Sequence, residues 1–327
     1  MILMKLMKPL ALATAATLSM SACGTDSVKG GSTDTGEDSV EIVASIYPLE
    51  YLATEVLGDS AEITSLAQQG SDTHDVELSP KQIASLGTAD LVLYLKGFQP
   101  AVDDAVAQSG NDNVLEVSEV IDLLASDGHA HEEETDGEHA EDQHAGEDHD
   151  HAHGDFDPHF WQDPERMSTI ADALVEAVAE QHPDVRETSK ANLDAFKTEM
   201  SQLDEEISTG LAECSVKEFI TTHQAFNYLT EDLDLTEISV VGLSSNEEPS
   251  PARIAEVQKT AKEHAVTTIF FETLTSPAVA EAIAGDLDLE TAVLDPLENV
   301  SENSPGDDYP SIMRANVEAL RTANDCK

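Results

Sequence analysis

The chain has 327 residues, and its 66 acidic and 16 basic side chains give a formal net charge of −50. This excess of negative charge argues against nucleic acid and anionic membrane surfaces as partners, because both would be repelled. An acidic field does attract cations, although a solvated acidic surface without a ligand would have the same composition.

The first 23 residues have the features of an export signal. A short basic region precedes the apolar stretch 10–20, which is shorter than the about 20 residues that cross a bilayer. A cysteine at the cut, Cys23, resembles a bacterial lipobox, so we expect a lipid-modified N-terminus. Plain secretion with an incidental cysteine is the alternative. The polar residues 24–39 are predicted to form a flexible tether.

Short strands alternate with helices from residue 40 onward. Strands are predicted at 40–46, 61–67 and 89–95, and helices at 48–58 and 79–87. This alternation favours a parallel α/β lobe, to which we assign residues 40–180.

The composition changes abruptly within this first lobe, over residues 127–157. The segment mixes acidic residues with seven histidines and has almost no large apolar side chains. The histidines are His129, His131, His139, His144, His149, His151 and His153. Because nothing here can drive burial, we predict a mobile loop.

A long amphipathic helix and a second lobe follow. Apolar side chains recur every three or four residues from Leu193 to Leu211, which predicts a connecting helix over 181–211. The alternation then restarts in residues 212–327, with strands at 217–222, 237–243, 266–272 and 290–295 and helices at 224–233, 250–265, 276–285 and 310–323. The predicted fold is α/β, with two parallel-sheet lobes joined by a long connecting helix.

Two cysteines, Cys214 and Cys326, remain if Cys23 is lipidated. Outside the cytoplasm, such a pair more often forms a disulfide than a reactive dithiol. We therefore predict a Cys214–Cys326 bridge that ties the C-terminus to the second lobe.

Four side chains that can bind metal follow strands or lie in strand-to-helix loops: His74, His159, His223 and Asp295. Ligands of open α/β sheets gather beyond the carboxyl ends of the strands, so we expect these residues to meet in the cleft between the lobes. Three imidazoles and a carboxylate suit Zn²⁺. His182 and His264 lack this context and are interpreted as ordinary surface or core residues.

The motifs around these residues resemble those of the zinc/manganese solute-binding proteins of ATP-binding-cassette importers, specifically the ZnuA-like zinc-uptake branch. The resemblance covers residues 40–325 and rests on the segments THDVELSP, DPHFWQDP, HQAFNYL and LDPLE. By position, His74, His159 and His223 resemble the three histidine ligands of the family. Asp295 resembles the carboxylate that completes the site in some members, while Glu77, Glu272 or water remain open for that fourth position.

Two positions depart from the family pattern. Thr73 precedes His74 where many members have proline, which alters the stiffness of the loop. Gln224 follows His223 where an aspartate is usual, and this change removes an acceptor that would orient the His223 ring. Neither change removes a ligand.

The resemblance implies a receptor that binds Zn²⁺ as its transported ligand and delivers it to a membrane permease driven by a partner ATPase. His223 stands where manganese-selective relatives have a carboxylate, and imidazole favours zinc. The histidine-rich loop would then collect zinc weakly beside the cleft, or it is an unspecific metal-binding linker.

Three other functions stay open: a manganese-binding homologue, a periplasmic zinc buffer or chaperone, and a zinc hydrolase. The hydrolase is disfavoured because the sequence has no HExxH motif, so we expect no enzyme activity. We expect a monomer that is exported and lipid-anchored to the outer face of the bacterial cytoplasmic membrane, or periplasmic.

Overall fold

A computed structural model of the chain describes residues 39–67, 73–126, 156–245, 248–274 and 276–327. The predicted signal peptide, Cys23, the tether up to residue 38 and the seven histidines of the acidic loop lie outside these residues. Within the described ranges, no helix is long and apolar enough to cross a membrane.

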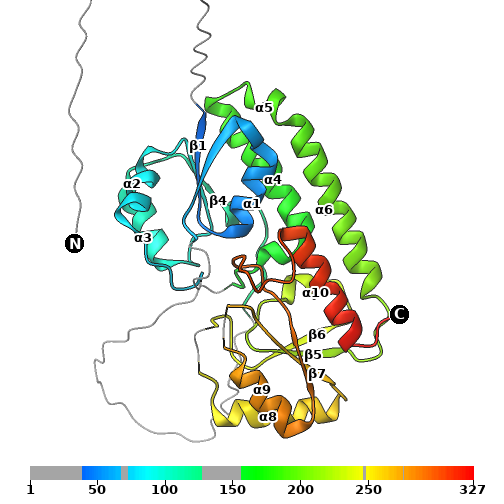
Figure 1. The fold of residues 1–327 in the computed structure, drawn as a ribbon. Coiled ribbons are helices and arrows are strands. Elements are labelled where there is room, and N and C mark those ends of the chain that lie inside the picture. The colour runs from blue at the N-terminus through cyan, green and yellow to red at the C-terminus, as the bar shows by residue number, and fades with distance from the viewer. Residues whose placement is uncertain (1–38, 68–72, 127–155, 246–247, 275) are drawn as a thin grey trace, which may run out of the picture. The chain divides into compact units, whose positions relative to one another are not determined.

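The first lobe contains a four-stranded parallel sheet in the order β2-β1-β3-β4 (Figure 1). Its strands are β1 (Val40–Ala44), β2 (Ala61–Ser65), β3 (Leu91–Tyr94) and β4 (Val114–Glu116). Its helices are α1 (Tyr47–Leu57), α2 (Pro80–Thr88) and α3 (Pro100–Ser109), with short 3-10 turns at Gly58–Ser60 and Val117–Glu119. The central strands β1 and β3 are short and, apart from the exposed Glu41 of β1, consist of buried apolar residues. The sequence-based prediction misses β4 and α3.

Local signals set the helix ends in this lobe. Ser79 and Gln82 form a capping box at the start of α2, in which each side chain bonds the backbone of the other. Helix α1 ends at Gly58, whose φ of 51° suits a residue without a Cβ atom.

Two long helices follow the first sheet: α4 (Pro164–Gln181) packs against α1 in the first lobe, and α6 (Lys190–Gly210) leads from there to the second lobe (Figure 1). The single turn α5 (Val185–Thr188) lies between them. The connecting helix predicted from residue 181 therefore begins later, at Lys190. Pro183 is the cause, because its ring removes an amide and holds the preceding His182 outside the helical region, at φ −122° and ψ 73°.

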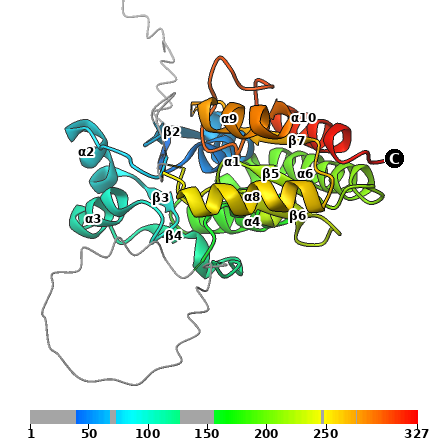
Figure 2. The same cartoon turned by 90° about the horizontal axis from the view of Figure 1, so that it is seen from below.

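The second lobe repeats the topology of the first, with a parallel sheet in the order β6-β5-β7-β8. Its strands are β5 (Glu218–Thr221), β6 (Thr236–Ser239), β7 (Thr268–Phe271) and β8 (Glu290–Val293). Its helices are α7 (Asn227–Thr230), α8 (Pro251–Glu263), α9 (Ala278–Leu287) and α10 (Tyr309–Ala323). Helices α8 and α9 pack on this sheet through a shared apolar cluster (Figure 2).

Helix α7 is shorter than the helix predicted at 224–233. The backbone amides of Ala225 and Phe226 donate to the side-chain carboxylate of Glu237 on β6, over 3.2 and 2.9 Å. Because these amides are held by a side chain, the segment between β5 and α7 forms a turn before the helix begins.

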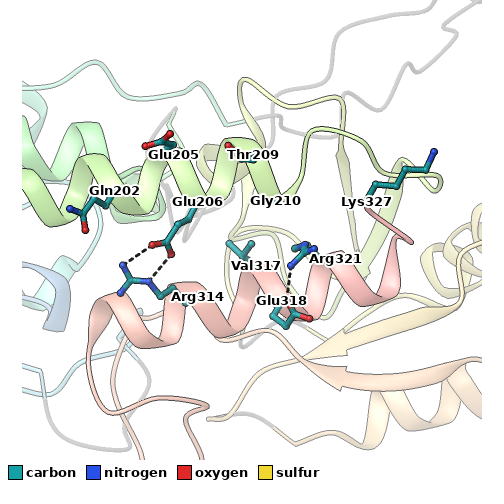
Figure 3. A pocket seen from close by; sticks show the side chains of 10 residues that line it. All are labelled: Gln202, Glu205, Glu206, Thr209, Gly210, Arg314, Val317, Glu318, Arg321 and Lys327. Atoms are coloured by element: carbon teal, nitrogen blue, oxygen red, sulfur yellow. Dashed lines mark hydrogen bonds and ion pairs between the residues drawn. The ribbon is translucent and has the colours of Figure 1, made fainter.

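Helix α10 packs along α6 near the end of the chain. Arg314 of α10 forms an ion pair with Glu206 of α6 at 2.7 Å, and Gly210 allows Val317 a close approach (Figure 3). The structure joins Cys214 to Cys326, as predicted, with an S–S distance of 1.97 Å. The C-terminal end of α10 is thus tied covalently to the start of the second lobe.

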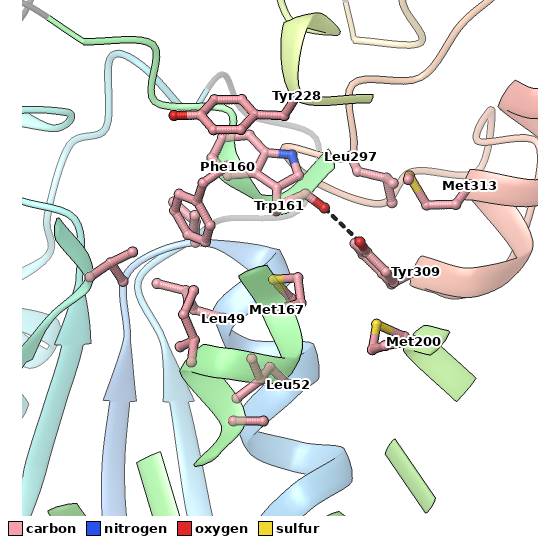
Figure 4. Packing of buried hydrophobic residues seen from close by; sticks show 14 of the residues in the cluster. Leu49, Leu52, Phe160, Trp161, Met167, Met200, Tyr228, Leu297, Tyr309 and Met313 are labelled. Atoms are coloured by element: carbon pink, nitrogen blue, oxygen red, sulfur yellow. Dashed lines mark hydrogen bonds between the residues drawn. The ribbon is translucent and has the colours of Figure 1, made fainter. Parts of the chain in front are cut away.

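One hydrophobic cluster contains residues of both lobes. Leu49 and Leu52 of α1, Met200 of α6, and Tyr309 of α10 all belong to it, and Trp161 lies among them (Figure 4). The Trp161 ring has no exposed surface. The lobes therefore share a core rather than meeting only through a linker.

Candidate metal centre

Three histidines and one glutamate converge between the lobes: His74, His159, His223 and Glu298. One nitrogen or oxygen atom of each lies within 4.8 Å of those of the other three. The residues are buried, with exposed fractions of 9%, 0%, 1% and 3% in chain order. This is a compact set of metal donors that is shielded from solvent.

Four of the distances between the donor atoms are close to those around a tetrahedral ion. Glu298 Oε1 lies 3.0 Å from His74 Nε2, 3.4 Å from His159 Nε2 and 3.3 Å from His223 Nε2. The Nε2 atoms of His159 and His223 are 3.4 Å apart. Bonds of about 2.0–2.1 Å from a tetrahedral Zn²⁺ place its ligands about 3.3–3.4 Å from one another. The three distances from Glu298 and the distance between His159 and His223 thus lie close to the tetrahedral value, and all four donor atoms lie within 4.8 Å of one another.

Three of the donors, His74, His223 and Glu298, come after strands β2, β5 and β8, whereas His159 comes just before a 3-10 turn. His74 lies between β2 and α2, and His223 comes two residues after Thr221, the last residue of β5. His159 precedes the 3-10 turn Phe160–Gln162 and α4, and Glu298 follows β8. The carboxyl ends of both parallel sheets therefore face one site, as expected for open α/β sheets.

Asp157 fixes the ring of His159. Its Oδ1 lies 2.7 Å from His159 Nδ1 and also accepts the backbone amide of His159 over 3.0 Å. A proton on Nδ1 that is donated to this carboxylate leaves the Nε2 lone pair facing the site. Burial opposes the charged imidazolium, but the charge and hydrogen bond of Asp157, together with the hydrogen bond to Glu298, raise the pKa of His159.

This role places Asp157 inside the ordered structure. The mobile loop predicted over 127–157 includes it, together with Phe156. In the structure Phe156 pairs with Ala125 in an antiparallel bridge, and Asp157 has no exposed surface. Asp157 Oδ2 also accepts from the Asn227 side chain over 2.9 Å, which links the supports of His159 to the second lobe.

Glu272, at the end of β7, supports His223 in the same way. Its Oε1 lies 2.5 Å from His223 Nδ1 and accepts the Thr222 hydroxyl over 2.8 Å. This carboxylate supplies the acceptor that was expected to be lost with Gln224. Burial opposes the charged form of His223, yet Glu272 and Glu298 raise its pKa well above the usual value.

Glu298, not the predicted Asp295, stands at the fourth corner. Burial alone would raise the pKa of Glu298, but the histidines around it, His74 first, hold it well below the usual value. Glu298 therefore carries a full negative charge that points at the three imidazoles.

Asp295 lies outside the group because its polar atoms build the turn before Glu298. Its Oδ1 accepts the amide of Leu297 over 2.9 Å, its Oδ2 accepts the Thr273 hydroxyl over 3.1 Å, and its backbone is paired with the Asn316 side chain. Leu297 adopts a φ of 61°, which is rare for a bulky residue. This left-handed step turns the next residue, Glu298, towards the histidines.

Trp161, two residues after His159, joins the His159 segment to the Glu298 turn. Trp161 Nε1 and Gln162 Nε2 each donate to the Pro296 carbonyl over 2.7 Å, and the Tyr309 hydroxyl donates to the Trp161 carbonyl over 2.6 Å (Figure 4). The Trp161 ring also packs edge-on against His159, with ring centres 5.2 Å apart. His159 and the Glu298 turn are therefore positioned by one buried network.

The sequence-based prediction places the three histidines in one metal site but does not include Glu298. The segment LDPLE contains both acids, and only the turn at Leu297 separates their roles. Of the other carboxylates considered, Glu272 lies on the far side of the His223 ring and Glu77 is exposed. His182 and His264 lie elsewhere, near Asp90 at 3.4 Å and Glu218 at 2.7 Å.

Comparison with known proteins gives consistent matches over nearly the whole described chain. A family model described as "ZnuA: Zinc-uptake complex component A periplasmic" matches residues 42–323. The zinc-binding protein AdcA of Streptococcus pyogenes serotype M3 is 32% identical over 295 residues, which are 88% of this chain and 57% of AdcA. The chain thus spans just over half the length of that relative.

Two further matches cover the relatives to different extents. The high-affinity zinc uptake system protein ZnuA of Bacillus subtilis is 32% identical over 310 residues, which are 93% of this chain and 93% of ZnuA. The crystal structure of Zn(II)-bound AdcA from Streptococcus pneumoniae superposes with a TM-score of 0.70 at 29% identity, covering 88% of this chain and 58% of AdcA. The sequence and the fold agree, and the chain belongs to the family of zinc-uptake complex component A, ZnuA.

Proposed function

We propose that this protein is an extracytoplasmic receptor that captures Zn²⁺ and delivers it to the permease of an ATP-binding-cassette importer. The observation that carries the proposal is the convergence of three buried imidazoles and one buried carboxylate, whose donor atoms all lie within 4.8 Å of one another. The names of the similar proteins, zinc-binding protein AdcA and high-affinity zinc uptake system protein ZnuA, support the same role.

In this proposal His74, His159, His223 and Glu298 bind the ion. Three imidazoles favour Zn²⁺ over Mn²⁺, which prefers harder oxygen ligands. Since all four corners are protein atoms, the site has no open position for a reactive water. The set therefore suits capture and release better than hydrolysis.

The proposed location follows from the N-terminal segment. Lipidation of Cys23 would anchor the receptor, as a monomer, to the outer face of the cytoplasmic membrane. A relative named zinc-binding lipoprotein AdcA supports the anchor. The histidines of segment 127–155, which lie outside the described residues, would collect zinc weakly beside this site.

Two measurements on the exported chain test the binding role. We expect tight binding of one Zn²⁺, measured by competition with a chromogenic chelator, and much weaker binding of Mn²⁺. Deleting residues 127–155 should keep the tight site and lower the total number of zinc ions bound. Loss of the tight site on this deletion would contradict the assignment of the ligands.

A growth experiment separates a transport receptor from a zinc buffer. The chain is expressed in a host that lacks its own receptor but keeps the cognate permease and ATPase, under zinc limitation. We expect the wild-type chain to restore growth and zinc uptake and the His223→Ala variant to fail. A wild-type chain that binds zinc tightly but restores neither would favour the buffer.

A further inference from the structure

The burial of the metal donors limits how an ion can enter or leave. The four side chains expose at most 9%, so a segment that carries a ligand must move during exchange. His74 is the most exposed of the four. It lies in the segment between β2, which ends at Ser65, and α2.

A buried hydrogen bond joins the His74 segment to the opposite lobe. The Thr73 hydroxyl donates to the backbone carbonyl of Glu298 over 3.1 Å. Both residues expose only 3% of their surface. The bond therefore links the residue next to one proposed ligand directly to the backbone of another.

Thr73 is itself held from the first lobe. The side chain of Gln99, just before α3, donates to the Thr73 carbonyl over 2.8 Å and is 1% exposed. A chain of two buried hydrogen bonds thus runs from Gln99 through Thr73 to Glu298.

Resting on the proposed function, we infer that Thr73 is a positioning residue that latches the His74 segment onto the Glu298 turn and slows the release of zinc. The His74 segment separates from Glu298 only if this bond breaks. Because the bond joins the two lobes, breaking it accompanies opening of the site. Its loss should therefore increase the dissociation rate and leave the association rate nearly unchanged.

Substitutions of Thr73 in the full chain test this latch. Thr73→Val keeps the shape of the side chain and removes the hydroxyl, whereas Thr73→Ser keeps the hydroxyl. One buried hydrogen bond corresponds to about a two- to tenfold change in an equilibrium. We expect Thr73→Val to release Zn²⁺ about two- to tenfold faster, measured by stopped-flow transfer to a chelator, and Thr73→Ser to behave like the wild type.

Two further variants separate the latch from general destabilisation. Thr230→Val removes a buried hydroxyl whose bond, to the Phe226 carbonyl at 3.2 Å, stays within the second lobe, and should leave the release rate unchanged. Gln99→Met removes the hydrogen bond from Gln99 to the Thr73 carbonyl, and it should also make zinc release faster, as Thr73→Val does.

The outcomes are distinguishable. Equal release from Thr73→Val and wild type, or equally fast release from Thr73→Val and Thr73→Ser, overturns the latch. So does faster release from Thr230→Val. If Thr73→Val does not fold, an unchanged release rate in Gln99→Met overturns it instead. A wild-type chain that does not bind Zn²⁺ would refute the proposed function itself.

Discussion

The two lobes have the same strand order but present their ligands differently. In the second lobe, only Thr222 separates His223 from the end of β5, and the supporting Glu272 comes from the neighbouring strand β7. In the first lobe, His74 lies in a longer segment after β2 and is held by Thr73 and by edge-on packing against Phe98.

This difference separates local from long-range positioning. A ligand at a strand end is placed by the sheet itself, so its position is determined within one lobe. The position of His74 depends on contacts with residues far away in the chain, Gln99 and Glu298. We therefore expect His223 to be held more firmly than His74.

The largest effect should come from pH, which acts on both lobes together. In the free site, His159 and His223 have raised pKa values, and only neutral imidazole binds zinc. Zinc affinity should therefore be highest at pH values above these raised pKa values and should fall as the pH drops through them. The fall should begin above the ordinary histidine pKa of about 6.5. Each protonated histidine costs up to about tenfold per pH unit, so we expect a loss of about a hundredfold or more between pH 7.5 and 5.5.

Chelator competition at several pH values, in buffers of constant ionic strength, checks this prediction. Glu298 should not limit binding in this range, because its pKa is held well below the usual value. An affinity that is flat over this range would contradict ligation by the histidines of both lobes.

Removal of a histidine tests the comparison directly. His223→Ala should weaken zinc binding by about a hundredfold or more, since each ligand carries a share of the metal-binding free energy. His74→Ala should cost less, because water can replace a ligand in the more exposed segment. His182→Ala is the matched control and should change nothing. A larger loss of zinc affinity for His74→Ala than for His223→Ala would contradict the expectation that His223 is held more firmly than His74.

The two acids of the LDPLE segment come next. Glu298→Ala should weaken binding by about a hundredfold, because it removes a ligand and its charge. Asp295→Ala should act indirectly, through the turn at Leu297, and should lower the melting temperature of the metal-free chain more than Glu298→Ala does. Calorimetric melting and zinc competition on both variants separate these effects. If Asp295→Ala loses more zinc affinity than Glu298→Ala, the assignment of Glu298 fails.

The smallest expected effects concern the carboxylates behind the rings. Glu272→Gln and Asp157→Asn keep the size of the side chain but weaken its hold on the ring proton, and each should cost about ten- to a hundredfold in affinity. Glu218→Gln, beside the remote His264, provides the control. Affinities of both variants equal to that of the wild type would show that the rings are oriented by packing alone.

Sequence patterns predict the architecture and the three histidines because both depend on local signals. The histidines occur in segments that follow strands, where open sheets place their ligands. Glu298 is not predictable in this way, since its direction depends on the left-handed backbone of Leu297 and on the pairing of Asp295 with Asn316. Asp157 is missed for a related reason. It follows the acidic and polar segment that ends at Asp155, and only the fold shows that it is buried against His159.

The hydrophobic cluster shared by both lobes restricts the motions available to this molecule. Swinging the lobes apart as rigid halves would bring residues such as Trp161, Tyr309 and Met200 into water, at a cost of about 25 cal/mol for each Å² of apolar surface. The residues on either side of His74, Thr73 and Asp75, are polar, so moving them brings little apolar surface into water. The fold therefore favours a local movement of the His74 segment over a hinge motion of the two lobes. Binding and release of the ion would then leave the shared hydrophobic cluster buried.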